Sequence, residues 1–179
     1  IVITVRFAAA FFSKKRIAAR PLLTLGIRYA FFSTMIAFAA GMIMILLRDR
    51  YLGSSGNFIV LHGLGFHALQ TLPLLGWFLE KTTSASAELD SNQGKRFSQI
   101  PLSKRLIHLG STAWTLAVLC IGLQTLLGKT VFEFSLLPIL AVFALLFWGV
   151  TLAASCYIYY KYYKSGVTSY KQQTSRSEF

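Results

Sequence analysis

The sequence predicts an all-α, polytopic transmembrane helical bundle with four complete spans and a partial N-terminal one. Three observations lead to this fold class. The 179 residues have a mean hydropathy of +0.57. Only 13% are charged, against roughly 25% in ordinary soluble domains. The apolar residues also gather into runs long enough to cross a bilayer, and only helices and closed barrels satisfy their backbone in lipid. We therefore expect residues 1–179 to form a single membrane domain.

The first apolar segment, residues 1–12 (IVITVRFAAAFF), is predicted to be a partial span. It is too short to cross a bilayer, and it lacks the small-residue cleavage pattern of a signal peptide. We expect the chain to be a piece of a longer membrane protein that begins partway through a helix. A basic patch at residues 14–20 follows, and Pro21 then suits the first turn of a helix.

Four later apolar runs have the length of complete spans, and polar segments separate them. The predicted spans are 22–47, 57–79, 106–127 and 131–157. Residues 80–105, rich in Ser, Thr, Asn and Gln, form the predicted cytoplasmic loop, and residues 158–179 form the predicted cytoplasmic tail. Pro73 and Pro138 each remove one backbone hydrogen bond within a predicted span, which favours a kink in each helix.

The uneven distribution of Lys and Arg predicts the orientation. The chain has 18 Lys and Arg against 6 Asp and Glu, a formal net charge of +12. If residues 14–20 are cytoplasmic, 13 of these cations lie on that side and only Arg48, Arg50 and Lys129 on the other. This bias predicts a multi-pass protein of the cytoplasmic (inner) membrane with its C-terminus in the cytoplasm, in contact with the bilayer and its anionic lipids. Arg28 is interpreted as an interfacial anchor. We expect no nucleic-acid partner, because the basic residues flank apolar runs.

The polar residues inside the second span form the candidate site. Polar side chains are expensive within a bilayer and need partners, and this span contains His62, His67 and Gln70. At about 100° per residue, His67 and Gln70 share a helix face with Gly63, whereas His62 points about 140° away from His67. We expect His67 and Gln70 to form a buried polar site in the bundle interior, with His67 more buried than His62.

Three interpretations of this site stay open. It is a hydrogen-bonded contact in a structural or accessory subunit, part of a transporter or channel-like protein, or the haem or quinone site of a redox protein. His108 lies too far from His67 in depth to share a haem with it. The sequence has no HExxH, CxxC, P-loop or GxGxxG motif, so we assign no catalytic residue and no metal site, and an enzyme is the less favoured interpretation.

The segment His62–Pro73 carries the pattern His-x-x-Gly-x-His-x-x-Gln-x-x-Pro. This pattern resembles a box found in a family of bacterial multi-spanning membrane proteins of uncharacterised function, with a similar arrangement of apolar segments around it. Members often have an acidic residue in the preceding turn, where this chain has Asn57. The resemblance implies a bacterial inner-membrane protein, and it implies no activity.

A stripe of small residues on the first span predicts a close helix contact. Ser33, Ala37 and Gly41 recur every four residues and therefore lie on one face. Small side chains let a second helix approach closely in a membrane. Gly63 of the second span is the expected partner. Beyond this contact within the chain, both a homo-oligomer and a hetero-oligomer stay open.

Overall fold

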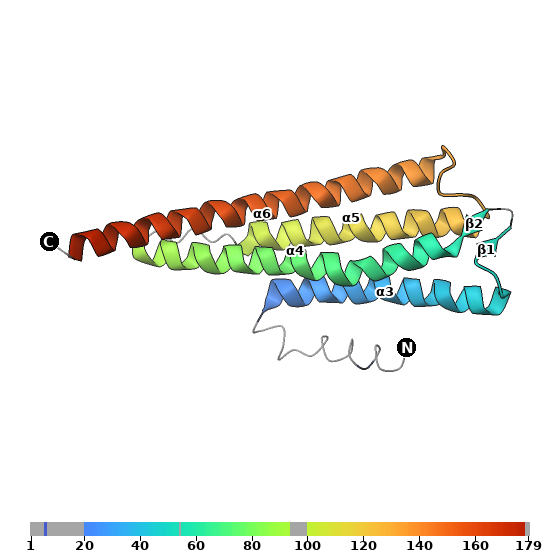
Figure 1. The fold of residues 1–179 in the computed structure, drawn as a ribbon, viewed down its shortest axis with the longest axis horizontal. Helices are drawn as coiled ribbons and strands as arrows, with labels where there is room; N and C mark the ends of the chain where they lie inside the picture. Colours follow the sequence, from blue (N-terminus) through green and yellow to red (C-terminus); the bar gives the residue numbers. More distant parts are fainter. Residues whose placement is uncertain (1–5, 7–19, 54, 94–99, 178–179) are drawn as a thin grey trace.

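The computed structural model describes residues 6, 20–53, 55–93 and 100–177, in which four long helices lie side by side (Figure 1). They are α3 (Pro21–Leu47), α4 (Phe58–Gln93), α5 (Ile100–Leu126) and α6 (Leu136–Ser177). Each of the four is long and apolar enough to cross a membrane. The predicted all-α membrane bundle is therefore confirmed. The predicted partial span over residues 1–12 lies outside the described residues, apart from Arg6.

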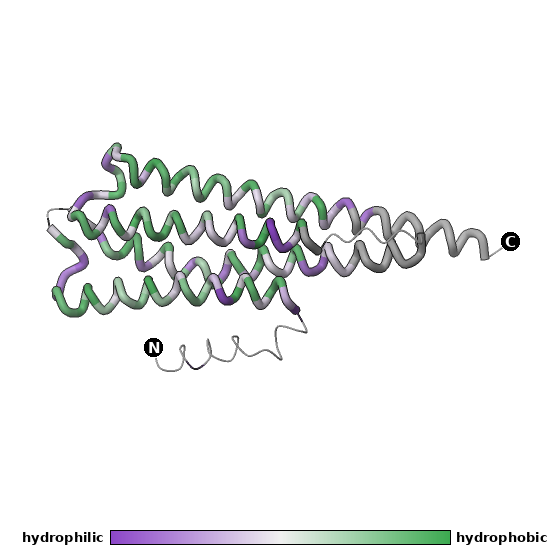
Figure 2. Tube along the Cα trace, turned by 180° about the vertical axis from the view of Figure 1, so that it is seen from behind, coloured by the Kyte–Doolittle hydropathy of each residue, from purple (hydrophilic) through white to green (hydrophobic). Residues whose placement is uncertain are grey.

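Two helices continue past the predicted ends of their spans. Apolar residues, drawn in green, follow the four helices through the bundle (Figure 2). Residues 80–93 belong to α4 and residues 158–177 to α6, so the predicted loop and tail are largely helical. These helices extend past the predicted span ends because polar composition alone does not end a helix. Residues 81–90 contain no Gly or Pro to end a helix.

The last helix begins later than predicted, at Leu136. Residues 131–135 belong instead to the connection from α5, where the Glu133 N–H donates to the Thr130 carbonyl at 3.3 Å. Pro138 therefore lies in the first turn of α6, where amides have no partner within the helix. Pro138 therefore removes no hydrogen bond within α6, and the reason for expecting a kink there no longer holds. Pro73, in contrast, lies inside α4 as predicted.

The helices α3 and α4 make the most extensive contact in the bundle. Ser33 and Ala37 are fully buried, and Ser33 Oγ donates to the Gly65 carbonyl at 3.2 Å. A Cβ atom on Gly65 would lie 2.7 Å from Ala37 Cβ, whereas one on Gly63 would meet nothing within 4 Å. The predicted small-residue contact is confirmed, but its partner is Gly65. Gly63 was the wrong choice because two residues differ by about 200° around a helix.

The remaining core joins α4, α5 and α6. Trp114 of α5 packs edge to face on Trp148 of α6, with ring centroids 5.0 Å apart. Leu72 of α4 and Val118 of α5 are fully buried in the same cluster. These large side chains hold α5 against α6, in contrast to the small residues between α3 and α4.

A short antiparallel ribbon connects α3 to α4. Its strands are β1 (Tyr51–Leu52) and β2 (Gly56–Asn57). The ribbon lies against the end of α5, because a Cβ atom on Gly56 would collide with the Thr125 carbonyl oxygen. The polar segment between the first two predicted spans therefore contributes to a pair of strands. No alternating pattern in the sequence indicated these strands.

Candidate functional site

His62 lies in the contact between α3 and α4. Its Nδ1 atom is 2.8 Å from the Ala37 carbonyl oxygen, so the ring N–H donates to a backbone acceptor of the neighbouring helix. The ring also packs edge to face on Phe66 at 4.7 Å and covers Gly41, where a Cβ atom would lie 3.1 Å from Cε1. His62 therefore acts as a structural link between the two helices.

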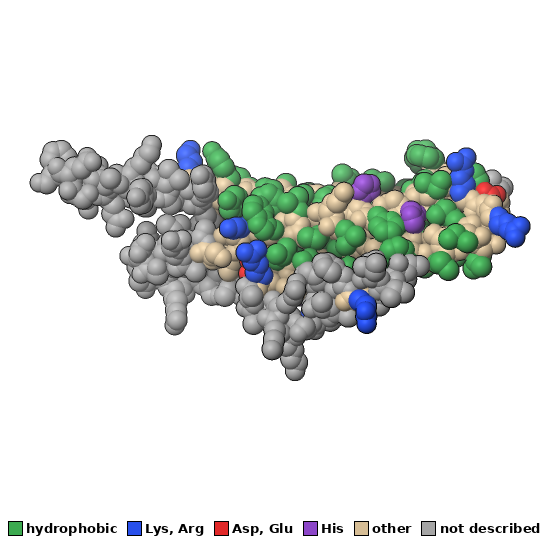
Figure 3. Space-filling model, turned by 60° about the horizontal axis from the view of Figure 1, so that its bottom comes forward, with side chains coloured by type: hydrophobic (Ala, Val, Ile, Leu, Met, Phe, Trp, Pro, Cys, Tyr) green, Lys and Arg blue, Asp and Glu red, His purple; other side chains and the backbone are tan. Residues whose placement is uncertain are grey.

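His67 and Gln70 share one face of α4, as predicted, and they contact each other. His67 Nδ1 and Gln70 Oε1 are 3.1 Å apart. Both side chains are exposed, however, while His62 is half-buried, and histidine side chains are visible among apolar ones on the face in Figure 3. The prediction that His67 is the more buried histidine and faces the interior was wrong. The interior face of α4 instead presents Ala68 and Leu72, both fully buried.

An open apolar groove runs over α5 between α3 and α6. Its volume is about 1200 Å³, and it is lined by residues of these three helices. Leu116 of α5 and Phe143 of α6 line it and are 49% and 64% exposed, respectively. The groove is therefore open to the outside of the bundle along its length, where lipid surrounds a membrane protein.

The polar side chains of the groove are few. Arg28 and Tyr29 come from α3, and Thr112 and Thr115 from α5. Both threonine hydroxyls donate to carbonyls of their own helix, at 2.7 and 2.9 Å. Arg28 is the charged residue in the lining of the groove.

A hydrogen bond between α3 and α5 stands beside Arg28. Tyr29 Oη lies 2.9 Å from His108 Nδ1. The two rings pack edge to face, with their centroids 5.9 Å apart. Sequence reasoning considered His108 only as a haem ligand and missed this contact. The residues are 79 positions apart, so no local pattern indicates that they meet.

Glu80 provides a second contact that sequence reasoning missed. Its Oε2 atom accepts hydrogen bonds from the backbone N–H groups of Leu22 at 2.9 Å and Leu23 at 3.2 Å. Arg20, the N-cap residue of α3, makes no side-chain capping bond. Glu80 of α4 therefore caps α3, although the sequence placed it at the start of a loop.

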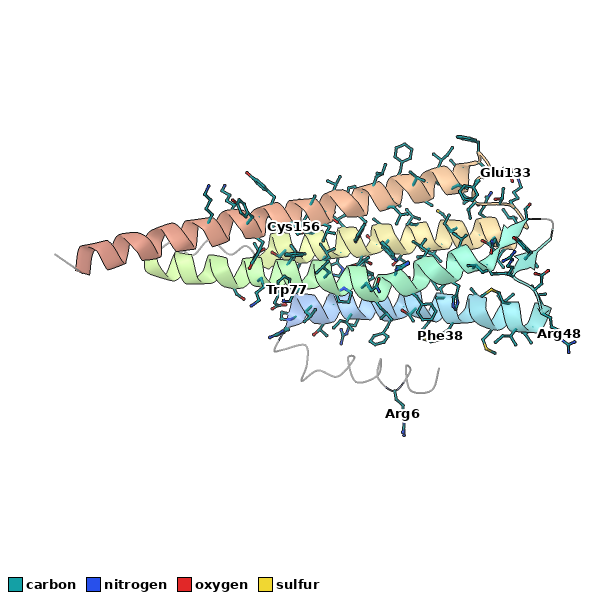
Figure 4. All side chains as sticks on the ribbon, in the orientation of Figure 1. Arg6, Phe38, Arg48, Trp77, Glu133 and Cys156 are labelled. Atoms are coloured by element: carbon teal, nitrogen blue, oxygen red, sulfur yellow. The ribbon has the colours of Figure 1, made fainter. Side chains whose placement is uncertain are left out.

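The opposite end of the bundle has its own polar contacts. Figure 4 shows Arg48 and Glu133 at this end. The fully buried Gln124 donates from Nε2 to the Thr130 carbonyl at 3.0 Å and accepts from Ser135 Oγ at 3.1 Å. Glu133 forms an exposed ion pair with Lys129 at 2.9 Å. These bonds hold the connection between α5 and α6.

The three histidines do not converge. His62 bonds to α3, His67 points outward from α4, and His108 bonds to Tyr29. None of them lines the groove. Among the residues that the structure describes, no group of three or more His, Cys, Asp or Glu side chains is arranged to hold a metal ion.

No protein family, curated protein or solved structure matches this chain. Its function is therefore argued from the geometry of the groove and of the polar side chains around it.

Proposed function

We propose that this chain is a multi-pass protein of the cytoplasmic membrane that binds an anionic phospholipid in the groove over α5. The observation that carries the proposal is an apolar groove of about 1200 Å³ with Arg28 in its lining. Pockets for small molecules typically measure about 300–1000 Å³, so this one has room for an acyl chain. Its exposed walls let a lipid enter sideways from the bilayer.

Arg28 supports the choice of an anionic headgroup. It lies about two turns from the start of α3, the end that the cation bias places in the cytoplasm. A guanidinium binds a phosphate through two parallel hydrogen bonds, and anionic lipids give the cytoplasmic leaflet its negative charge. The acyl chain then extends from Arg28 along Leu116 and Phe143.

The His/Gln pair is a weaker centre for this function. A transport path requires polar groups that follow one another through the protein. In the structure His62 faces α3 while His67 and Gln70 face outward. These side chains support helix contacts better than they support a path or a cofactor site.

Filling the groove is expected to block the lipid. In Leu116→Trp the larger ring occupies the groove floor, and labelling by a photoreactive phosphatidylglycerol in bacterial-lipid vesicles should fall about fivefold or more, as expected for a loss of about 1 kcal/mol of binding free energy. Leu123→Trp is the matched control. Leu123 has the same 49% exposure on α5 but does not line the groove. Equal labelling of the two variants would contradict the proposal.

The headgroup preference is tested separately. The wild-type protein should be labelled more strongly by phosphatidylglycerol than by phosphatidylcholine carrying the same photoreactive chain. Arg28→Gln should remove this preference, and Arg28→Lys should retain part of it, because lysine keeps the charge without the paired donors. A wild-type protein that labels equally with both lipids would overturn the assignment to anionic lipids.

The proposed orientation has its own test. With 13 cations on one side and three on the other, reporter fusions at Ser91 and after Phe179 should be active only as cytoplasmic reporters. A fusion at Gly53 should be active only as an exterior reporter. The reverse pattern would place Arg28 in the outer leaflet and remove the electrostatic basis for the lipid site.

A further inference from the structure

The outward face of α4 carries a polar pair at membrane depth. His67 lies about 14 Å along the helix from Phe58, close to the middle of a hydrocarbon core about 30 Å thick. His67 and Gln70 are exposed there. Their bond to each other uses one ring nitrogen and one amide oxygen. The other ring nitrogen and the amide nitrogen have no partner among the described residues.

The second ring nitrogen of His67 and the amide nitrogen of Gln70 complement each other as hydrogen-bonding groups. Because Gln70 Oε1 accepts, His67 Nδ1 carries the proton, and the neutral ring presents Nε2 as an acceptor. Gln70 Nε2 presents N–H donors. If the amide is turned over, the roles of donor and acceptor are exchanged between the two residues. In either arrangement the pair offers one donor and one acceptor, so it matches a second copy of itself.

The surroundings of the pair allow close approach. Gly63 lies one turn before His67 on the same face, and a Cβ atom on it would meet nothing within 4 Å. The side-chain direction of Gly63 therefore points into open space, unlike that of Gly65. Small residues on an open face of a membrane helix let a second helix approach closely.

We infer that this face of α4 binds a second copy of the chain. Two copies in one membrane have the same orientation, so they are related by a twofold axis along the membrane normal. His67 of each copy then pairs with Gln70 of the other, which gives two equivalent hydrogen bonds across the axis. The interface lies on α4, whereas the lipid groove is formed by α3, α5 and α6, so the two proposals are independent.

Disulfide cross-linking in native membranes tests the position of the interface. In a full-length chain with Cys120→Ala and Cys156→Ala, Gly63→Cys should give a covalent dimer upon mild oxidation. Leu119→Cys, a 51% exposed position in the groove, should not. An absence of dimer at position 63, an equal yield at position 119, or a cross-link from 63 to a different protein would each overturn the inference.

Mixed dimers test the hydrogen bonds themselves. His67→Leu alone and Gln70→Leu alone each remove both bonds, and one such bond is worth about a threefold change in affinity. Each variant should therefore dimerise about tenfold more weakly in vesicles, as measured by energy transfer. A mixture of the two variants keeps one bond and should recover to about threefold below wild type. A mixture no stronger than either variant would overturn the pairing. Each variant must unfold at the wild-type temperature, and one that does not is replaced by methionine at the same position, His67→Met or Gln70→Met.

Discussion

Gly65→Ala is expected to destabilise the bundle by about 1–3 kcal/mol, the usual penalty for overpacking a tight contact. The added methyl carbon would lie 2.7 Å from Ala37 Cβ and 3.0 Å from the Ser33 carbonyl oxygen. Neither atom belongs to a flexible side chain that can turn away. The two helices would have to separate, which also lengthens the bond from Ser33 Oγ to the Gly65 carbonyl.

Gly63→Ala is the matched control for this experiment. It makes the same chemical change two residues away on the same helix, where the new methyl group meets nothing within 4 Å. Removing a glycine from a helix interior gains roughly 0.5–1 kcal/mol. We therefore expect a neutral or slightly stabilised protein. The free energy of unfolding is measured in dilute mixed micelles, so that association does not contribute. Equal losses in the two variants would mean that α3 and α4 do not meet at Gly65.

The contrast between these glycines shows what the sequence could predict. Hydropathy located the four helices, and the helical repeat identified which residues share a face. Neither indicated which face of α4 meets α3, because lipid is as apolar as a membrane-protein core. The argument from desolvation placed His67 inside, whereas the structure buries Ala68 and exposes His67.

The contacts between residues far apart in the chain also could not be predicted from the sequence. Tyr29 and His108 meet because α3 and α5 lie in a particular axial register, and Leu22 meets Glu80 for the same reason between α3 and α4. Capping patterns that can be recognised in a sequence come from residues next to the helix start. A cap supplied from 58 residues away has no such signature. The groove likewise depends on where α3 and α6 lie on either side of α5, which no local sequence pattern indicates.

Glu80→Ala is expected to destabilise the protein by about 2 kcal/mol, because hydrogen bonds to a charged group are worth roughly 1.5–3 kcal/mol and their loss leaves amides unpaired. The carboxylate bonds the N–H groups of the second and third residues of α3, the groups that a normal N-cap side chain would bond. Its negative charge also suits the positive end of the helix dipole. Arg20 cannot replace it, since arginine has no side-chain acceptor.

Two further variants separate capping from a general effect of losing an acidic residue. Glu80→Gln keeps an oxygen acceptor without the charge and should lose about half as much stability as Glu80→Ala. Glu133→Ala removes the exposed ion pair with Lys129, in which the side chains are 48% and 42% exposed, and such pairs contribute about 0–1 kcal/mol. Unfolding in mixed micelles should therefore rank Glu80→Ala as the most damaging, then Glu80→Gln, then Glu133→Ala. If Glu133→Ala is as damaging as Glu80→Ala, the cap on α3 contributes no more than a surface ion pair, and α3 is held by its packing and its other hydrogen bonds with α4 and α5.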